Sequence, residues 1–144
     1  MTKLIQKTLS IPCNPKFLGE VSELLEESLG EARVPKRDVM LITLAIEEVI
    51  TSITQYAEEK SIVNDVSVSI DIDDVRFRAV IVDSCNVFEL NGGGVLSDSQ
   101  FTERVDRERK YKLNMYLLRL AMDEITYSYK KGFENELVLI KFLQ

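Results

Sequence analysis

The stretch from Leu44 to Ala57 constrains the fold of this chain more than any other part of it. Its apolar residues recur at helical spacing and cover most sides of the helix that they predict, so we expect this helix to be largely buried. Glu48 and Ser52 lie four residues apart and project from the same helical face, which also carries Leu41. A carboxylate on an inward face is costly unless it is paired or used. Glu48 is therefore the first candidate functional residue.

Length and charge limit the classes of protein to consider. A chain of 144 residues has the size of one domain, so we expect residues 1–144 to form a single unit. The net charge of −6 argues against nucleic acid as a partner, because phosphate binding needs a basic surface. The chain has no histidine, which excludes His-based triads and most zinc sites. No signal segment or membrane span is visible, so we expect a cytoplasmic protein with no membrane association.

Hydrophobic periodicity predicts the order of the elements. We expect Asn14 to cap a helix that starts at Pro15 and Gly30 to end it. The expected elements are a strand over 3–11, helices over 15–29 and 35–57, strands over 66–72 and 75–82, a helix over 113–122, and strands over 125–129 and 137–143. This order predicts an α+β fold, a two-layer α/β sandwich with helices on one face of a mostly antiparallel sheet.

Residues 83–109 show no clear period. A long segment without secondary structure is uncommon in a compact domain and is usually functional, so 85–110 is a candidate lid-like loop with 92–94 as its hinge. The alternative is an insertion without a role. Basic residues at 107, 109, 110 and 112 form a cluster in this acidic chain, and they favour equally a phosphate-facing lid and a solvated charge run.

Three segments together resemble the N, G1 and G2 boxes of the GHKL ATPase superfamily. They are residues 44–52, 81–88 and 113–119, the last with 122–127 downstream. The chain most resembles the bacterial anti-sigma-factor serine/threonine kinases of the RsbW and SpoIIAB type. This resemblance covers nearly the whole chain, and it implies a histidine-kinase-like ATPase fold with ATP and Mg²⁺ as cofactors.

The resemblance also implies roles for individual residues. Glu48 matches the glutamate that acts as general base. Ser52 stands in the position of the asparagine that holds Mg²⁺ between the ATP phosphates, and a serine hydroxyl is a Mg²⁺ ligand in other phosphate sites. Asp83 matches the aspartate that accepts a hydrogen bond from the adenine amino group. An aspartate at the end of a strand is also often a turn-former.

Three positions depart from the family pattern where it has glycines. Cys85 replaces the glycine two residues after the adenine-binding aspartate. Lys112 and Asn114 replace glycines on either side of Leu113, in the run whose backbone amides approach the phosphates. Asparagine is the best substitute for glycine in a left-handed conformation, and Lys112 supplies a charge for the phosphates.

These matches and departures leave two hypotheses open. In the first, the chain binds ATP and Mg²⁺ and phosphorylates a serine of an antagonist protein. In the second, it is a degenerate, nucleotide-free GHKL domain that works as a protein-binding module. By resemblance, the partners are a sigma factor or an antagonist protein, and the protein forms a homodimer.

Simpler interpretations of single residues also stay open. Glu48 could be paired with Arg37, Arg76 or Lys112 across the core. Glu47 is expected to face solvent, and Tyr116 is expected to belong to the core more than to a nucleotide pocket.

Overall fold

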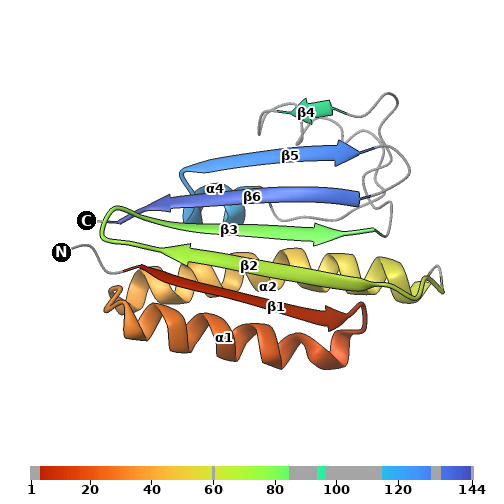
Figure 1. The fold of residues 1–144 in the computed structure, drawn as a ribbon, viewed down its shortest axis with the longest axis horizontal. Coiled ribbons are helices and arrows are strands. Elements are labelled where there is room, and N and C mark those ends of the chain that lie inside the picture. The colour runs from red at the N-terminus through yellow and green to blue at the C-terminus, as the bar shows by residue number, and fades with distance from the viewer. Residues whose placement is uncertain (1–3, 60, 85–93, 97–114, 131–133, 144) are drawn as a thin grey trace.

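The fold has two layers, with helices covering one face of an antiparallel sheet (Figure 1). It is a computed structural model that describes residues 4–59, 61–84, 94–96, 115–130 and 134–143. The elements are β1 (Ile5–Pro12), the 3-10 helix η1 (Pro15–Phe17), α1 (Leu18–Glu31), α2 (Lys36–Glu59), β2 (Asp65–Ile72), β3 (Arg76–Asp83), β4 (Gly94–Leu96), α4 (Met115–Ala121), β5 (Glu124–Lys130) and β6 (Glu134–Phe142). The predicted fold class and the predicted order of elements are confirmed.

The sheet has the strand order β1-β2-β3-β6-β5-β4, and every neighbouring pair is antiparallel. The short strand β4 pairs with β5, with Gly94 opposite Tyr129, and it extends the sheet at that edge. This strand falls inside the segment 85–110, for which the sequence showed no period. The remainder of that segment, including positions 92 and 93 of the expected hinge, lies outside the described residues.

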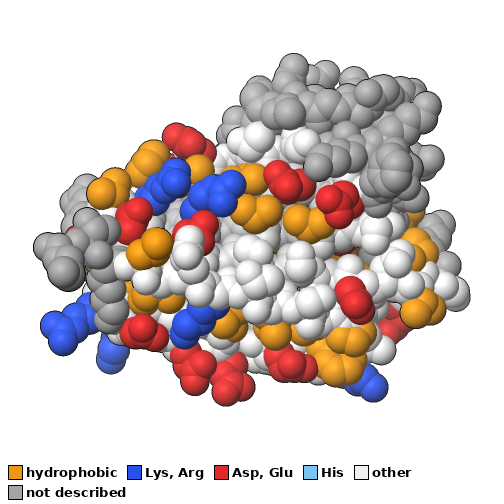
Figure 2. Space-filling view, viewed as in Figure 1, with side chains coloured by type: hydrophobic (Ala, Val, Ile, Leu, Met, Phe, Trp, Pro, Cys, Tyr) orange, Lys and Arg blue, Asp and Glu red, His pale blue; other side chains and the backbone are white. Residues whose placement is uncertain are grey.

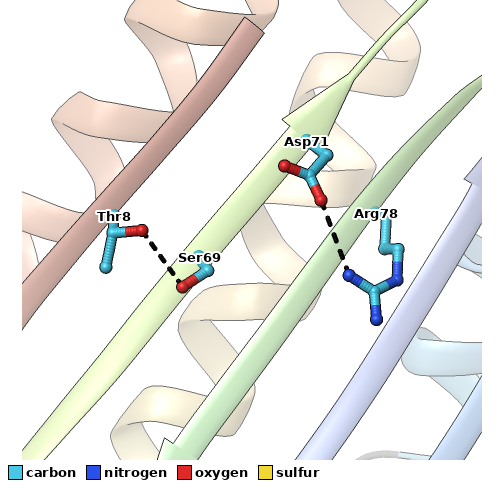
Figure 3. Close-up of polar contacts among 4 residues, drawn as sticks. All are labelled: Thr8, Ser69, Asp71 and Arg78. Carbon is cyan, nitrogen blue, oxygen red and sulfur yellow. Dashed lines mark hydrogen bonds and ion pairs between the residues drawn. The ribbon is translucent and has the colours of Figure 1, made fainter.

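Alternation along the strands separates a core face from an outer face. The buried side chains on the core face are Val66, Val68, Ile70 and Ile72 of β2, Phe77, Ala79 and Ile81 of β3, and Leu137 and Leu139 of β6. The outer face is more polar: Thr8 donates a hydrogen bond to Ser69 at 3.2 Å, and Arg78 pairs with Asp71 at 3.5 Å (Figure 3). The helices therefore cover one face only.

The helix α2 is the central element of the helical layer. Its buried residues are Ile42, Thr43, Ala45, Ile46, Val49, Ile50, Ile53, Thr54 and Ala57, which occupy about half of the helix circumference. Among the described residues, α2 is also the one helix long and apolar enough to cross a membrane, but half of its most apolar window is buried inside the protein. Because the core helix of a soluble protein has the same properties, the fold is compatible with a soluble protein.

The start of the helical layer matches the prediction, but the end of α1 does not. Asn14 caps η1 by accepting a hydrogen bond from the backbone N–H of Lys16 at 3.0 Å. Gly30 lies inside α1, whose last residue is Glu31. The left-handed residue is Arg33, with a φ of 59°. Its N–H donates to the Gly30 carbonyl, and the following N–H of Val34 donates to the carbonyl of Leu29, which is a Schellman motif.

Replacing Arg33 with glycine removes the strain of this conformation. A non-glycine residue in the left-handed region costs about 1 kcal/mol, so Arg33→Gly is expected to raise the free energy of unfolding by about 1 kcal/mol in urea denaturation. Arg33→Ala, which keeps the Cβ atom, is the matched control and is expected to give no such gain. An equal gain in both variants would contradict the assignment of strain to Arg33.

The turn between β2 and β3 is held by the carboxylate of Asp73. It accepts hydrogen bonds from the backbone N–H groups of Val75 and Arg76, both at 2.8 Å. The hydrogen bond from Arg76, followed by that from Val75, lowers the pKa of Asp73 below its ordinary value of 3.8. A lowered pKa means that the charged carboxylate contributes stability above the ordinary value and loses it as the pH falls through the lowered one.

We therefore expect acid to weaken this turn. Between pH 6 and pH 2.5 the wild-type protein should lose more stability than Asp73→Asn, whose amide does not titrate. Urea denaturation at the two pH values measures the difference. Equal pH dependence of the two proteins would show that the Asp73 hydrogen bonds do not contribute to stability.

Candidate functional site

The helix α2 places Glu48 and Ser52 one turn apart on the same side, as predicted. Both side chains are half-buried. Their half-burial follows from the neighbouring residues of α2, because Ala45 is buried whereas Leu44 is 43% exposed. The two residues therefore lie at the border of the buried face and do not point into the core. The expectation of an inward-facing Glu48 is corrected to this border position, because the buried arc of α2 is centred on Ile46 and Ile53.

The Glu48 carboxylate has no hydrogen bond or ion pair with another described residue. In particular, neither Arg37 nor Arg76 pairs with it, and Lys112 lies outside the described residues. Its neighbour Glu47 behaves differently: it is half-buried and accepts a hydrogen bond from the Ser22 hydroxyl of α1. The expectation that Glu47 faces solvent is therefore wrong, because α1 packs beside α2 on that side.

Asp83 ends the core-facing series of β3 and is itself buried, with 3% of its surface exposed. The Nδ2 atom of Asn135 donates a hydrogen bond to Oδ1 of Asp83 at 3.1 Å. The hydroxyl of Tyr127 in turn donates to Oδ1 of Asn135. The three residues form a buried polar network that offsets the cost of placing a carboxylate on the core face of the sheet.

Strand register brings this network together. Asp83 lies directly opposite Asn135 across the β3–β6 pair. Tyr127 lies opposite Leu137, so it is diagonal to Asn135 on the same face. The predicted strand over 137–143 begins two residues after Asn135, so the sequence analysis did not identify Asn135 as a partner of Asp83 or Tyr127 as a partner of Asn135. The alternation of β6, continued back from Leu139 through Leu137, reaches Asn135 and could have identified it.

The end of β3 and the second half of α2 lie at the same end of the molecule (Figure 1). Both elements run in the same direction, so α2 ends at the end of the molecule where Asp83 ends β3. Glu48 lies at the middle of α2, and Ser52 lies one turn further toward that end. The other predicted nucleotide-binding residues lie outside the described residues; they are Cys85, Lys112, Leu113 and Asn114.

The helix α4 begins at Met115 and packs against α2. Its buried side chains are Leu118 and Ala121, and Met122 directly after it is also buried. Tyr116 is 78% exposed, so the expectation that it belongs to the core is wrong. The helix is short, and Tyr116 lies on the side that faces away from α2 and the sheet.

The described residues are chemically suited to a magnesium ion bound together with phosphate. Glu48 and Ser52 are oxygen donors, which is the ligand class that Mg²⁺ prefers, and Mg²⁺ usually takes only one or two protein ligands beside phosphate oxygens and waters. Within the described part of the chain, no group of three His, Cys, Asp or Glu residues could hold a metal by itself. Metal binding at this site would therefore depend on a phosphorylated ligand.

Comparison with known proteins assigns no family to the chain, because no family model matches it and no curated protein matches it either.

The network at Asp83 yields a stability prediction. Asn135→Leu removes the donor to a buried carboxylate and is expected to lower the free energy of unfolding by about 3 kcal/mol, whereas Tyr127→Phe removes one hydroxyl and should cost about 1 kcal/mol. The double variant Asp83→Leu/Asn135→Leu also removes the carboxylate that Asn135→Leu deprives of this donor, so its loss should be smaller than the sum of the two single losses. Denaturant unfolding of the wild type, the three single variants Asn135→Leu, Tyr127→Phe and Asp83→Leu, and the double variant tests the network, and a loss in the double variant equal to the sum of the Asp83→Leu and Asn135→Leu losses would contradict it.

Proposed function

We propose that the chain is an ATP-binding regulatory protein that resembles an anti-sigma-factor serine/threonine kinase. The observation that carries this proposal is the half-buried Glu48 carboxylate, which has no partner among the described residues and lies one turn from Ser52. A half-buried carboxylate with no cation beside it among the described residues is available to a ligand or substrate. Asp83 at the same end of the molecule supplies a second carboxylate for the same ligand.

Each residue has a distinct role in this proposal. Asp83 accepts a hydrogen bond from the adenine amino group, and its hydrogen bond from Asn135 fixes the orientation of the carboxylate. Ser52 would hold Mg²⁺, and the bound ion would supply neutralisation of the phosphate charge. Glu48 accepts the proton of an acceptor serine hydroxyl, whose oxygen forms the new bond to the γ-phosphorus while the bond to the β-phosphate oxygen breaks.

Calorimetric titration with ATP tests the proposed role of Ser52, and an assay of ATP turnover tests the proposed role of Glu48. The wild-type protein should bind ATP more tightly with Mg²⁺ than without it. Ser52→Ala should reduce the Mg²⁺-dependent affinity about tenfold, which is about 1.4 kcal/mol, and leave the affinity without Mg²⁺ unchanged. Glu48→Gln should keep ATP binding but lower ATP turnover by about a hundredfold or more, because it removes the general base.

The carboxylate of Glu47, the residue before Glu48, provides a matched control for Glu48→Gln. Glu47→Gln changes the same functional group on the other side of α2, so its ATP turnover should stay within about twofold of the wild-type value. The absence of any binding at millimolar ATP with Mg²⁺ would overturn the proposal.

A second function is favoured by one specific observation. The Asp83 carboxylate is buried and already hydrogen-bonded within the core, which is a structural role that needs no adenine. Together with the non-glycine residues Cys85, Lys112 and Asn114, this supports a nucleotide-free protein-binding module. Under this alternative, ATP with Mg²⁺ would leave the melting temperature unchanged while a protein partner still binds.

Both proposed functions share the same partners, oligomeric state and cellular location. By resemblance, the partners are a sigma factor or an antagonist protein, the protein forms a homodimer, and it works in the cytoplasm. Pull-down with a candidate sigma factor, repeated with Glu48→Ala, distinguishes the two functions. Loss of phosphorylation with binding retained supports the kinase, whereas clear ATP turnover with no protein partner would contradict the binding module.

A further inference from the structure

A groove of about 610 Å³ lies between α1 and α2, away from the end of the molecule that carries Asp83. Its apolar lining comes from Val34 in the connection between the helices and from Val39, Met40 and Leu44 of α2. At its far end the groove reaches Glu47, whose carboxylate is hydrogen-bonded to α1. The groove shares no residue with the candidate nucleotide site, although Leu44 lies one turn from Glu48.

Two apolar side chains of the groove are open to solvent. Met40 is 56% exposed and Leu44 is 43% exposed, and they lie one turn apart on α2. A contiguous exposed apolar patch with a polar rim is typical of an interaction site. The spacing of one turn matches the spacing of apolar residues on an amphipathic helix that lies along a groove.

On the α1 side of the groove, the backbone of α1 is open to close approach by a second helix. Gly30 of α1 lines the groove, and nothing lies within 4 Å of the position that its Cβ atom would occupy. A glycine inside a helix costs about 0.5–1 kcal/mol relative to alanine, so this position is not optimised for the stability of α1. The missing side chain leaves room for a second helix beside Met40 and Leu44.

The charge of α1 defines the partner. The helix contains Glu20, Glu23, Glu26, Glu27 and Glu31 and no lysine or arginine. Of these, Glu26 lines the groove, and Glu31 is ion-paired with Lys7 on the other side of α1. The groove lining also includes Glu47 and one basic residue, Lys36, so its charged residues are acidic on balance. In Figure 2, acidic side chains gather along the lower margin of the molecule, where Figure 1 places α1. A partner that docks here gains from positive charge, whereas a second copy of this chain would bring a second acidic α1 toward the first.

From these observations we propose that the groove between α1 and α2 docks a basic amphipathic helix of a partner protein. Apolar side chains of that helix contact Met40 and Leu44, its backbone passes over Gly30, and its lysine or arginine residues face Glu26. This inference does not depend on nucleotide binding, since none of the groove residues belongs to the candidate nucleotide site.

The test uses a designed probe and the full chain. The probe is a fluorescein-labelled helical peptide of 18 residues with a leucine stripe flanked by lysines, and its counterpart has glutamates in place of the lysines. Fluorescence polarisation should show saturable binding of the lysine peptide, at least tenfold tighter than that of the glutamate peptide. The affinity should fall as the salt concentration rises.

Two glycines of α1 supply the matched variants. Gly30→Arg places a large, positively charged side chain in the groove and should weaken binding of the lysine peptide at least tenfold. Gly19→Arg makes the same change on α1 outside the groove, at a position that also has nothing within 4 Å, and should change the affinity less than twofold. Absence of saturable binding, equal affinity for both peptides, or equal effects of the two variants would each overturn the proposal.

Discussion

The burial of α2 against the sheet is the contact on which the other parts of the structure depend. Nine of its side chains are buried, so the helix must be covered on about half of its circumference. The core faces of β2, β3 and β6 supply that cover from one side, and α1 and α4 pack against the flanks of α2. Because the buried arc is this wide, Glu48 and Ser52 are held at its border, where they are shielded yet reachable.

The core face of the sheet carries one buried polar network among the described residues, at Asp83, Asn135 and Tyr127. Its position is set by register, since β3 ends and β6 begins at the same point of the sheet. A satisfied network of this kind orients the carboxylate of Asp83 and stabilises that end of the fold. Both proposed functions use it, one to present Asp83 to adenine and the other as structure alone.

The proposed nucleotide site and the proposed docking groove both involve α2. The helix α2 contacts both α1 and α4, and the groove that Met40 and Leu44 line lies between α2 and α1. The proposed nucleotide site and the proposed docking groove thus use different residues of the same core helix, with Leu44 of the groove one turn before Glu48. The side of α1 that meets a partner is acidic, which restricts the choice of partner.

Periodicity was sufficient to predict the layers and the element order, because the alternation of β2 and β3 and the helical spacing of α2 reflect burial directly. It failed where a contact distant in sequence decides the outcome. Glu47 is half-buried because Ser22 lies across from it.

Asn135 was missed for a related reason, since its partner Asp83 lies far away in the sequence. The end of α1 was placed at Gly30 because glycine favours the left-handed conformation, whereas the structure puts Arg33 there. In these cases residue type alone gave the wrong position or orientation.

The central claim is that Asp83 recognises the adenine amino group, and competition between ATP and inosine triphosphate tests it most directly. Inosine carries an oxygen at the position of that amino group, so it would face the carboxylate with an acceptor and no donor. We expect ATP with Mg²⁺ to displace a fluorescent nucleotide at a concentration at least tenfold lower than inosine triphosphate requires. Equal potency of the two nucleotides would contradict the claim.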